Sequence, residues 1–167
     1  MIMNSKIFIG IGANLRFNQS LTIKENCLNV INSFEKNNIF VEKISNWYES
    51  YPVPESNQPL FVNSVVKVAY NEDPFSLINL LHEIEKSFGR KRKIVNGNRT
   101  IDLDIIDFNG IKKNSLPILP HPRMQDRLFV LYPLSDIEPF WRHPISNKNL
   151  DSIIEEIRTV QKIKKIK

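Results

Sequence analysis

Residues 61–89 read FVNSVVKVAYNEDPFSLINLLHEIEKSFG and join a strand pattern directly to a helix pattern. Side chains alternate along the first ten positions, which predicts a strand over Phe61–Tyr70 with two distinct faces. One face carries Val62, Val66, Val68 and Tyr70, and the other carries Phe61, Asn63, Val65 and Lys67. Asp73 and Pro74 then supply a helix N-cap and a first helical residue. Apolar residues recur at helical spacing from there, and we expect the helix to end at Gly89.

The chain before residue 61 predicts a strand, a helix and a second strand. Lys6–Ala13 is apolar and β-branched, which is typical of a buried strand. A helix is expected from Ser20 or Thr22, where Thr22 and Glu25 would form a capping box. Ile39–Tyr48 alternates as a strand does, and residues 49–60 form a loop that contains three prolines.

The chain after residue 89 supplies the remaining predicted strands and helices. Thr100–Phe108 predicts a strand, and Asn109-Gly110 favours a type I′ turn into a short return strand. The chain is then loop-like from Pro117 through residue 123, apolar from residue 128, and helical from Asn149 to about Val160. This order predicts an α+β protein with a ferredoxin-like βαββαβ core. Helices would pack on one face of a mostly antiparallel sheet, with an extra hairpin strand and a C-terminal helix, in a single domain of residues 1–167.

Composition narrows the class of protein. Of the 167 residues, 41% are hydrophobic and 25% are charged, as in ordinary globular proteins. The longest apolar stretches, residues 7–13 and 128–134, are far shorter than the roughly 20 residues that cross a membrane. Cys27 is the only cysteine and cannot form a disulfide within the chain, so we expect an inert core thiol and a cytoplasmic location.

The net charge is +5, and the excess gathers between residues 86 and 99. This stretch has no acidic residue and six basic ones: Lys86, Arg90, Lys91, Arg92, Lys93 and Arg99. It is either a solvated surface segment or a site for a polyanion, such as nucleic acid or a nucleoside triphosphate. The four lysines after residue 161 are expected to form a frayed basic tail.

The motif RTIDLDI at residues 99–105 is the most chemically specific part of the chain. Residues two apart on a strand share a face, so Asp102 and Asp104 would stand together while their neighbours point into the core. Such a pair, roughly 7 Å apart at the Cα atoms, suits Mg²⁺, which completes its shell with water and substrate phosphates. The alternative is a solvent-facing acidic pair that protects an edge strand. The basic cluster just upstream favours a site for a metal triphosphate.

A second group of residues suits an aromatic ligand. Phe61 and Asn63 share a strand face, and an aromatic ring beside an amide can hold a flat, nitrogen-rich heterocycle. Phe129 is a candidate for a second ring. His121 lies in a Pro-His-Pro loop, where it is either packed or a donor to phosphate.

Other candidates are weaker. His82 and Glu85 lie three apart on one helix face, which is either an exposed polar face or part of a site. His143 has no obvious partner and is expected at the surface. The stretch Gly10-Ile11-Gly12 lacks the third glycine of a dinucleotide fingerprint, and no P-loop motif occurs in the chain.

Several blocks occur together in the order of one enzyme family. They are GANL at 12–15, QPLFVN at 58–63, HEIE at 82–85, FGR at 88–90, RTIDLDI at 99–105 and PHPRM at 120–124, with Arg127 and Phe129 following. Over nearly its full length the chain resembles the 6-hydroxymethyl-7,8-dihydropterin pyrophosphokinases of folate biosynthesis. The resemblance implies transfer of a pyrophosphoryl group from ATP to the pterin hydroxymethyl group, with release of AMP.

The resemblance also implies roles for individual residues. Asp102 and Asp104 would hold two Mg²⁺ ions that bridge the triphosphate, and Arg90 and Arg99 would act in catalysis by taking phosphate charge. The pterin would contact Ser50, Val53, Phe61, Asn63 and Phe129. ATP would contact His82, Glu85, Arg99, His121 and Arg127. These two small molecules are the expected partners, with no nucleic acid and no membrane, and the protein is expected to be a monomer.

The chain departs from the family pattern at residues 96–98, which read Asn-Gly-Asn where many members have Trp-Gly-Pro. Tyr51 stands where a proline is common, and Phe61 stands where a tyrosine often does. The loop from Gly89 to Asn98 is expected to close over ATP. Two other interpretations stay open: an RNA-binding module, because RNA-recognition domains share this element order, and a non-catalytic relative that keeps the pterin pocket without turnover.

Overall fold

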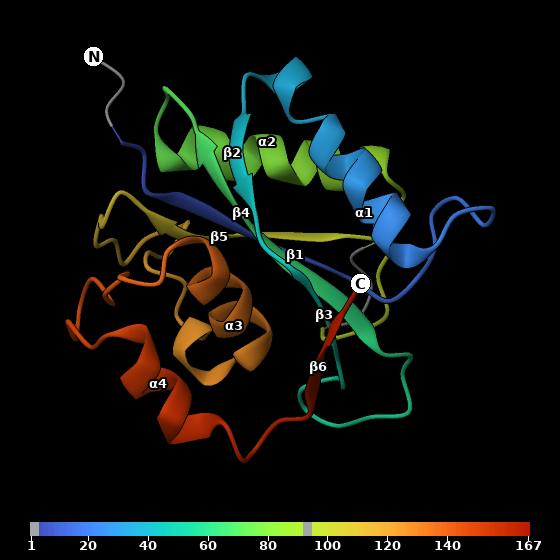
Figure 1. The fold of residues 1–167 in the computed structure, drawn as a ribbon. Helices are drawn as coiled ribbons and strands as arrows, with labels where there is room; N and C mark the ends of the chain where they lie inside the picture. Colours follow the sequence, from blue (N-terminus) through green and yellow to red (C-terminus); the bar gives the residue numbers. More distant parts are fainter. Residues whose placement is uncertain (1–3, 92–94) are drawn as a thin grey trace.

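The computed structural model describes residues 4–91 and 95–167. An antiparallel sheet runs through the middle, with helices on both sides (Figure 1). The elements are β1 (Ile7–Ala13), α1 (Ile23–Asn32), β2 (Phe40–Ile44), β3 (Trp47–Ser50), β4 (Phe61–Ala69), α2 (Pro74–Ser87), β5 (Asp102–Phe108), α3 (Leu128–Ile137), α4 (Leu150–Ile157) and β6 (Ile163–Ile166), with short 3₁₀ helices at Glu35–Asn37 and Met124–Asp126. The strand order is β5-β1-β4-β3-β6, and β2 also pairs with β4.

The sheet has the ferredoxin-like arrangement, so the predicted α+β class is confirmed. β1 lies between β4 and β5 and is antiparallel to both, while β2 and β3 pair with β4 on its other side. The predicted helix starts are also confirmed: Thr22 and Glu25 form a capping box before α1, and Asp73 caps α2 with Pro74 at its first position. After α2 the chain turns at Gly89, whose φ of +79° is a conformation that favours glycine.

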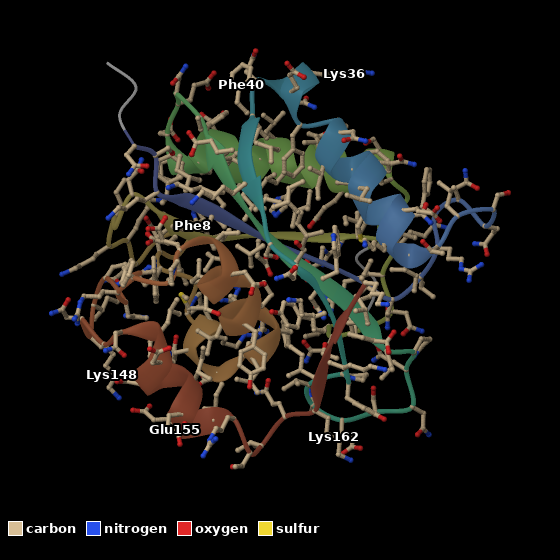
Figure 2. All side chains as sticks on the ribbon, in the orientation of Figure 1. Phe8, Lys36, Phe40, Lys148, Glu155 and Lys162 are labelled. Carbon is tan, nitrogen blue, oxygen red and sulfur yellow. The ribbon has the colours of Figure 1, made fainter. Side chains whose placement is uncertain are left out.

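Helices cover both faces of the sheet, whereas the sequence predicted helices on one face. α1 and α2 pack on one side, and α3 and α4 pack on the other around Phe8, Val65 and Ile106 (Figure 2). The second layer forms because α3 is apolar around most of its surface. Lys67 also points to this side, where its Nζ lies 3.1 Å from Glu138 Oε2. The alternation of β4 therefore separates two buried faces.

The predicted strand over Ile39–Tyr48 is wrong, because it is two strands. The ladder between β2 and β4 shifts register near Val41, and the chain breaks at Ser45 and Asn46 before β3 begins. Ser45 Oγ accepts a hydrogen bond from the Val65 N–H at 2.9 Å, so a side chain replaces a backbone partner there. Apolar alternation continues through such a break, which is why it did not appear in the pattern.

The extra strand comes from the C-terminus and not from a hairpin. Asn109 and Gly110 both have positive φ, as a type I′ turn requires, but no return strand follows them among the described residues. The predicted frayed tail instead forms β6, which pairs with β3 and sets Lys164 opposite Glu49. Ile166 packs against the core and gives the tail one apolar anchor, while Lys164 and Lys165 between the two isoleucines are exposed.

The prediction of a surface position for His143 is also wrong. Its Nδ1 accepts hydrogen bonds from the N–H groups of Ile145 and Ser146, each at 3.2 Å, and its ring lies edge-on to Trp141.

The last helix begins after Asn149 as predicted and ends at Ile157. Arg92 and Lys93 of the basic cluster, and the middle of the loop predicted to close over ATP, lie outside the described residues. Within the described chain, no helix has the length and apolar character needed to cross a membrane.

Candidate active site

Asp102 and Asp104 project from the same side of β5, on the face of the sheet that carries α3. The antiparallel pairing sets them opposite Gly12 and Gly10 of β1. A Cβ atom at Gly12 would lie 3.3 Å from Asn63 Oδ1 on β4. The glycines therefore leave open the floor between the two carboxylates and the amide of Asn63, and the shared face of Asp102 and Asp104 agrees with the predicted alternation.

Arg90 reaches the aspartates from the turn after α2. Its Nη1 donates to Glu85 Oε1 at 2.8 Å and also to Asp102. Glu85 is 1% exposed, and the same Oε1 accepts a hydrogen bond from the Leu103 N–H at 2.8 Å. The buried Glu85 carboxylate thus fixes both the Arg90 guanidinium and the start of β5.

Arg99 lies between the acidic pair and an aromatic ring. Its Nη1 donates to Asp102 Oδ2 at 3.1 Å, and its guanidinium carbon is 5.0 Å from the centre of the Phe61 ring. Its Nε is buried and has no hydrogen-bond partner among the described residues. Asp102 is therefore neutralised by two guanidinium groups, and Arg99 keeps one N–H for a further acceptor.

Asp104 is less tightly paired. Among the described residues, the one basic side chain within 4 Å of its carboxylate is His121, whose Nε2 is 3.7 Å from Asp104 Oδ2. Burial, followed by Arg127 and Arg123, lowers the pKa of His121 to about 4, so the ring is neutral at pH 7. His121 Nδ1 accepts from the Arg123 N–H at 3.1 Å, which leaves the ring proton on Nε2. Burial and the neighbouring Asp102 raise the pKa of Asp104, so its charged form is favoured when a cation binds nearby.

The residues predicted for an aromatic ligand form the opposite side of the site. Asn63 is 3% exposed, and its Nδ2 donates to Ser50 Oγ at 2.9 Å and to the Phe61 carbonyl at 3.3 Å. Its Oδ1 accepts no hydrogen bond from the described residues, so an acceptor stays available beside Gly12. Phe129 enters from the first turn of α3, with the Arg127 guanidinium 5.5 Å from its ring centre.

These groups line one cavity of about 450 Å³ at the end of the sheet face beyond α3. The predicted site residues that line it are Ser50, Val53, Phe61, Asn63, His82, Arg90, Arg99, Asp102, Asp104, His121, Arg127 and Phe129. Glu85 is the predicted site residue outside this lining, and it lies behind Arg90. Acidic, basic and aromatic groups thus converge in a space large enough for small-molecule substrates.

The profile of the 7,8-dihydro-6-hydroxymethylpterin-pyrophosphokinase (HPPK) family matches residues 8–139, which include the whole acidic and basic centre of this cavity. The chain belongs to the HPPK family. A 2-amino-4-hydroxy-6-hydroxymethyldihydropteridine pyrophosphokinase of Aquifex aeolicus is 35% identical over 147 residues, which are 86% of this chain and 87% of that protein. The corresponding protein of Bacillus subtilis is 45% identical over 101 residues, which are 59% of this chain and 60% of that protein.

Some HPPK relatives are much longer. The folic acid synthesis protein FOL1 of Dictyostelium discoideum is 38% identical over 145 residues, and the match covers 84% of this chain and 21% of FOL1. The HPPK-DHPS protein of Plasmodium falciparum, solved with pteroate, aligns with 93% of this chain and 43% of its own at a TM-score of 0.63 and 15% identity. The chain therefore spans about a fifth of FOL1, and the structural likeness supports the HPPK fold.

The sequence predicted no role for Asn14 and Gln58, two polar residues whose side chains bind to cavity-lining residues. Asn14 is 2% exposed and accepts a hydrogen bond from the Arg99 N–H at 2.9 Å. Gln58 Nε2 donates to the Asn96 carbonyl at 2.8 Å. Asn14 directly follows a buried strand, which could have marked it as a candidate. Its hydrogen-bond partners are distant in sequence, so the local pattern does not identify them.

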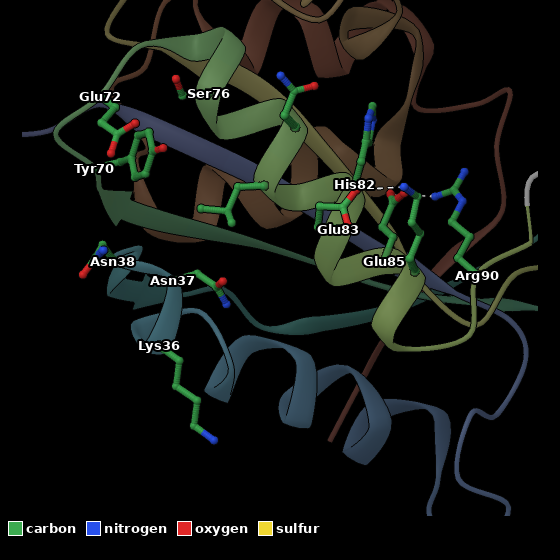
Figure 3. Close-up of a pocket in the computed structure, with 13 residues that line it drawn as sticks. Lys36, Asn37, Asn38, Tyr70, Glu72, Ser76, His82, Glu83, Glu85 and Arg90 are labelled. Carbon is green, nitrogen blue, oxygen red and sulfur yellow. Dashed lines mark hydrogen bonds and ion pairs between the residues drawn. The ribbon is translucent and has the colours of Figure 1, made fainter.

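A second, more open hollow of about 900 Å³ lies over the outer face of α2. Figure 3 shows Tyr70, Glu72 and Asn38 at one end of it, with His82 and Arg90 at the other. His82 and Arg90 also line the HPPK cavity, so the two spaces meet at these residues.

Proposed function

We propose that this protein transfers a pyrophosphoryl group from ATP to 6-hydroxymethyl-7,8-dihydropterin, releasing AMP and the pterin diphosphate in folate biosynthesis. One observation supports this most strongly: an Asp-x-Asp pair stands in a single cavity between guanidinium groups and an aromatic wall that carries a free amide oxygen. Membership of the HPPK family supports the same reaction.

The basic side of the cavity would bind the triphosphate. Arg90 and Arg99 flank Asp102, and Arg127 lies across the site beside Phe129. Charge-assisted hydrogen bonds from guanidinium groups to phosphate oxygens are short and strong, so these arginines would both hold ATP and stabilise charge as the reaction proceeds. His82 would lie beside the nucleotide where the two hollows meet. Glu85 would act through Arg90, because its carboxylate is already bound to that guanidinium.

The acidic pair has the donor chemistry of a magnesium site. Mg²⁺ binds to one or two carboxylates and completes its octahedron with water and substrate phosphates. Burial and the neighbouring Asp102 carboxylate raise the pKa of Asp104, and Asp102 stands beside it on the same face. These two residues would hold the two ions expected of the family, and bound magnesium would neutralise triphosphate charge.

The aromatic side would bind the pterin. Phe61 and Phe129 would contact the faces of the ring, and Val53 would contact its edge. Asn63 is held by Ser50, so its Oδ1 would accept a hydrogen bond from a pterin N–H in a fixed direction. This amide would provide specificity, because a buried acceptor disfavours ring systems that present no donor.

In the reaction, the hydroxymethyl oxygen of the pterin attacks the β-phosphorus of ATP. The new O–P bond forms while the bond from the β-phosphorus to the oxygen bridging the α-phosphorus breaks, and that oxygen leaves on AMP. The hydroxyl proton passes to solvent. The chain supplies orientation and a fixed array of positive charge, and these can account for most of the rate in phosphoryl transfer.

An RNA-binding role is not favoured. RNA-recognition domains bind bases on the open face of a βαββαβ sheet. Here α3 and α4 cover that face around Phe8, Val65 and Ile106, and the uncovered end carries two aspartates.

A monomeric state, a cytoplasmic location and a single domain over residues 1–167 stay predictions from the sequence.

The test is product analysis with the full chain. The protein is incubated with ATP, MgCl₂ and 6-hydroxymethyl-7,8-dihydropterin, and the nucleotides and pterins are separated by chromatography. We expect AMP and pterin diphosphate in equal amounts, and no AMP when the pterin is omitted. Formation of ADP with a pterin monophosphate, or binding of both substrates without turnover, would refute the proposed reaction.

A further inference from the structure

Helix α3 begins beside the cavity and takes its cap from a distant part of the chain. Its N-cap residue is Arg127, whose side chain makes no capping hydrogen bond among the described residues. The first N–H groups of a helix have no partner within the helix and need an acceptor from elsewhere. The Leu128 N–H donates to Gln161 Oε1 at 2.9 Å, 33 residues later in the chain. A side chain of the C-terminal segment therefore caps α3.

The Gln161 amide binds the backbone on both sides of Arg127. Its Nε2 donates to the Asp126 carbonyl, and its Oε1 accepts from Leu128. Arg127 lies between these two residues and lines the cavity, where its guanidinium is 5.5 Å from the centre of the Phe129 ring. One amide group thus fixes the backbone that carries a guanidinium on the ATP side and the helix turn that carries an aromatic ring on the pterin side.

The capping bond cannot be replaced easily by water. Leu128 is 1% exposed, and a buried N–H group without an acceptor costs at least as much free energy as a lost hydrogen bond. If the Gln161 side chain were removed, the first turn of α3 would have to open or shift until Leu128 found another acceptor. Arg127 and Phe129 belong to that turn, so both side chains would move with it.

Gln161 is itself held in place, because the chain that follows it forms β6. Ile163–Ile166 pairs with β3 at the side of the sheet (Figure 1). The Tyr51 N–H donates to the Lys162 carbonyl at 3.4 Å, and Lys162 Nζ lies 5.5 Å from the centre of the Tyr51 ring. The first of these contacts belongs to this chain, because the proline common in the family at position 51 has no N–H. The match to the HPPK profile ends at residue 139, so the anchored segment lies outside it.

We propose that Gln161 is a positioning residue of the active site, which holds the first turn of α3 so that Arg127 meets the triphosphate and Phe129 meets the pterin. The C-terminal segment Gln161–Ile166 is then part of the working site, although its residues lie outside the described lining of the cavity. Small displacements of positioned groups reduce binding and catalysis strongly, so a single amide at this point has a measurable effect. This inference rests on the proposed function.

The test measures the affinity of the full chain for a non-hydrolysable ATP analogue with Mg²⁺ by calorimetry. Gln161→Ala should raise the dissociation constant about tenfold, near the lower end of the range for losing one hydrogen bond to a charged group. In an Arg127→Gln background, the same Gln161→Ala change should raise it less than twofold, because the displaced guanidinium is already absent. A general loss of structure would instead lower the affinity by the same factor in both backgrounds.

Asn149→Ala is the matched control, because it removes an amide cap from α4, where Asn149 Oδ1 accepts from the Ser152 N–H at 2.9 Å. Both cap variants should lower the melting temperature by roughly 2–4 °C, the usual effect of one lost cap in a chain of this size. Only Gln161→Ala should lose ATP affinity.

Three results would overturn the inference: wild-type affinity in Gln161→Ala, an equal loss of affinity in Asn149→Ala, or a full tenfold loss from Gln161→Ala in the Arg127→Gln background. Absence of AMP release by a wild-type protein that binds the analogue would instead refute the proposed function.

Discussion

Replacing Glu85 with glutamine should weaken ATP binding, although Glu85 lies outside the cavity lining. The Glu85 Oε1 atom accepts hydrogen bonds from Arg90 Nη1 and from the Leu103 N–H, each at 2.8 Å, and the residue is 1% exposed. Glutamine keeps an oxygen acceptor for Leu103 and removes the negative charge beside Arg90. Among the described residues, Arg90 would then keep its ion pair with Asp102 and its hydrogen bond to the Ile101 carbonyl at 3.1 Å, and the guanidinium would shift toward Asp102.

The size of the effect follows from the burial of the pair. Removing one partner of a buried ion pair costs about 3–5 kcal/mol when the other charge is left alone. Because Arg90 keeps Asp102, we expect about 1–3 kcal/mol of lost unfolding free energy for Glu85→Gln. For a chain of this size that is a fall in melting temperature of roughly 2–12 °C. Displacement of one phosphate-binding guanidinium should raise the dissociation constant for ATP about tenfold, or about 1.4 kcal/mol.

The assay is a double-mutant cycle with Glu85→Gln, Arg90→Gln and the double variant, measured by calorimetric titration of an ATP analogue with Mg²⁺. If Glu85 acts through Arg90, the double variant binds no more weakly than Arg90→Gln alone. Glu83→Gln is the matched control, because Glu83 is an exposed glutamate of the same helix paired with Lys86. If the dissociation constant of the double variant rises by the product of the two single-variant increases, Glu85 contacts the nucleotide independently of Arg90.

Three further outcomes follow from the geometry. Asn63→Ala should weaken pterin binding by about 1–3 kcal/mol while ATP affinity stays within twofold, because the buried pterin N–H loses its acceptor. Equal losses for both ligands in calorimetry would show that the pterin does not bind beside Asn63. Chelation of Mg²⁺ should weaken ATP binding at least about tenfold, and an unchanged affinity would contradict the metal assignment. Burial raises the pKa of Asp107 in the folded state, so its stabilising contribution is present below its unfolded pKa and is lost as pH rises through the folded value. Urea unfolding should therefore show the stability of wild type relative to Asp107→Asn falling as the pH rises above the unfolded pKa of about 3.9, and a pH-independent difference would contradict this.

Local patterns predicted much of the fold and the centre of the site. The strand and helix in residues 61–89 follow from periods of 2 and 3.6, and their ends follow from Asp73, Pro74 and Gly89. The common face of Asp102 and Asp104 follows from strand geometry alone. Each of these features depends on residues close together in sequence, which is why a single sequence contains enough information to predict it.

Features that depend on distant partners were missed. β6 forms because Ile163–Ile166 can pair with β3 more than a hundred residues earlier, and a short basic tail gives no local sign of that. The break at Ser45 depends on a hydrogen bond to Val65. Asn14 reaches Pro59, Asn98 and Arg99 across three loops, and the types of these residues do not encode the distances between them.

The most direct test of the proposed chemistry is AMP release by Asp104→Asn in the presence of ATP, Mg²⁺ and the hydroxymethyl pterin. Loss of one carboxylate from the acidic pair should lower turnover at least about 100-fold. The melting temperature of the metal-free variant should stay the same or rise, because asparagine removes a partly desolvated charge that is repelled by the neighbouring Asp102. Asp151→Asn, at an exposed position of α4, should keep full turnover. Near wild-type AMP release by Asp104→Asn would contradict the assignment of this pair as the centre of catalysis.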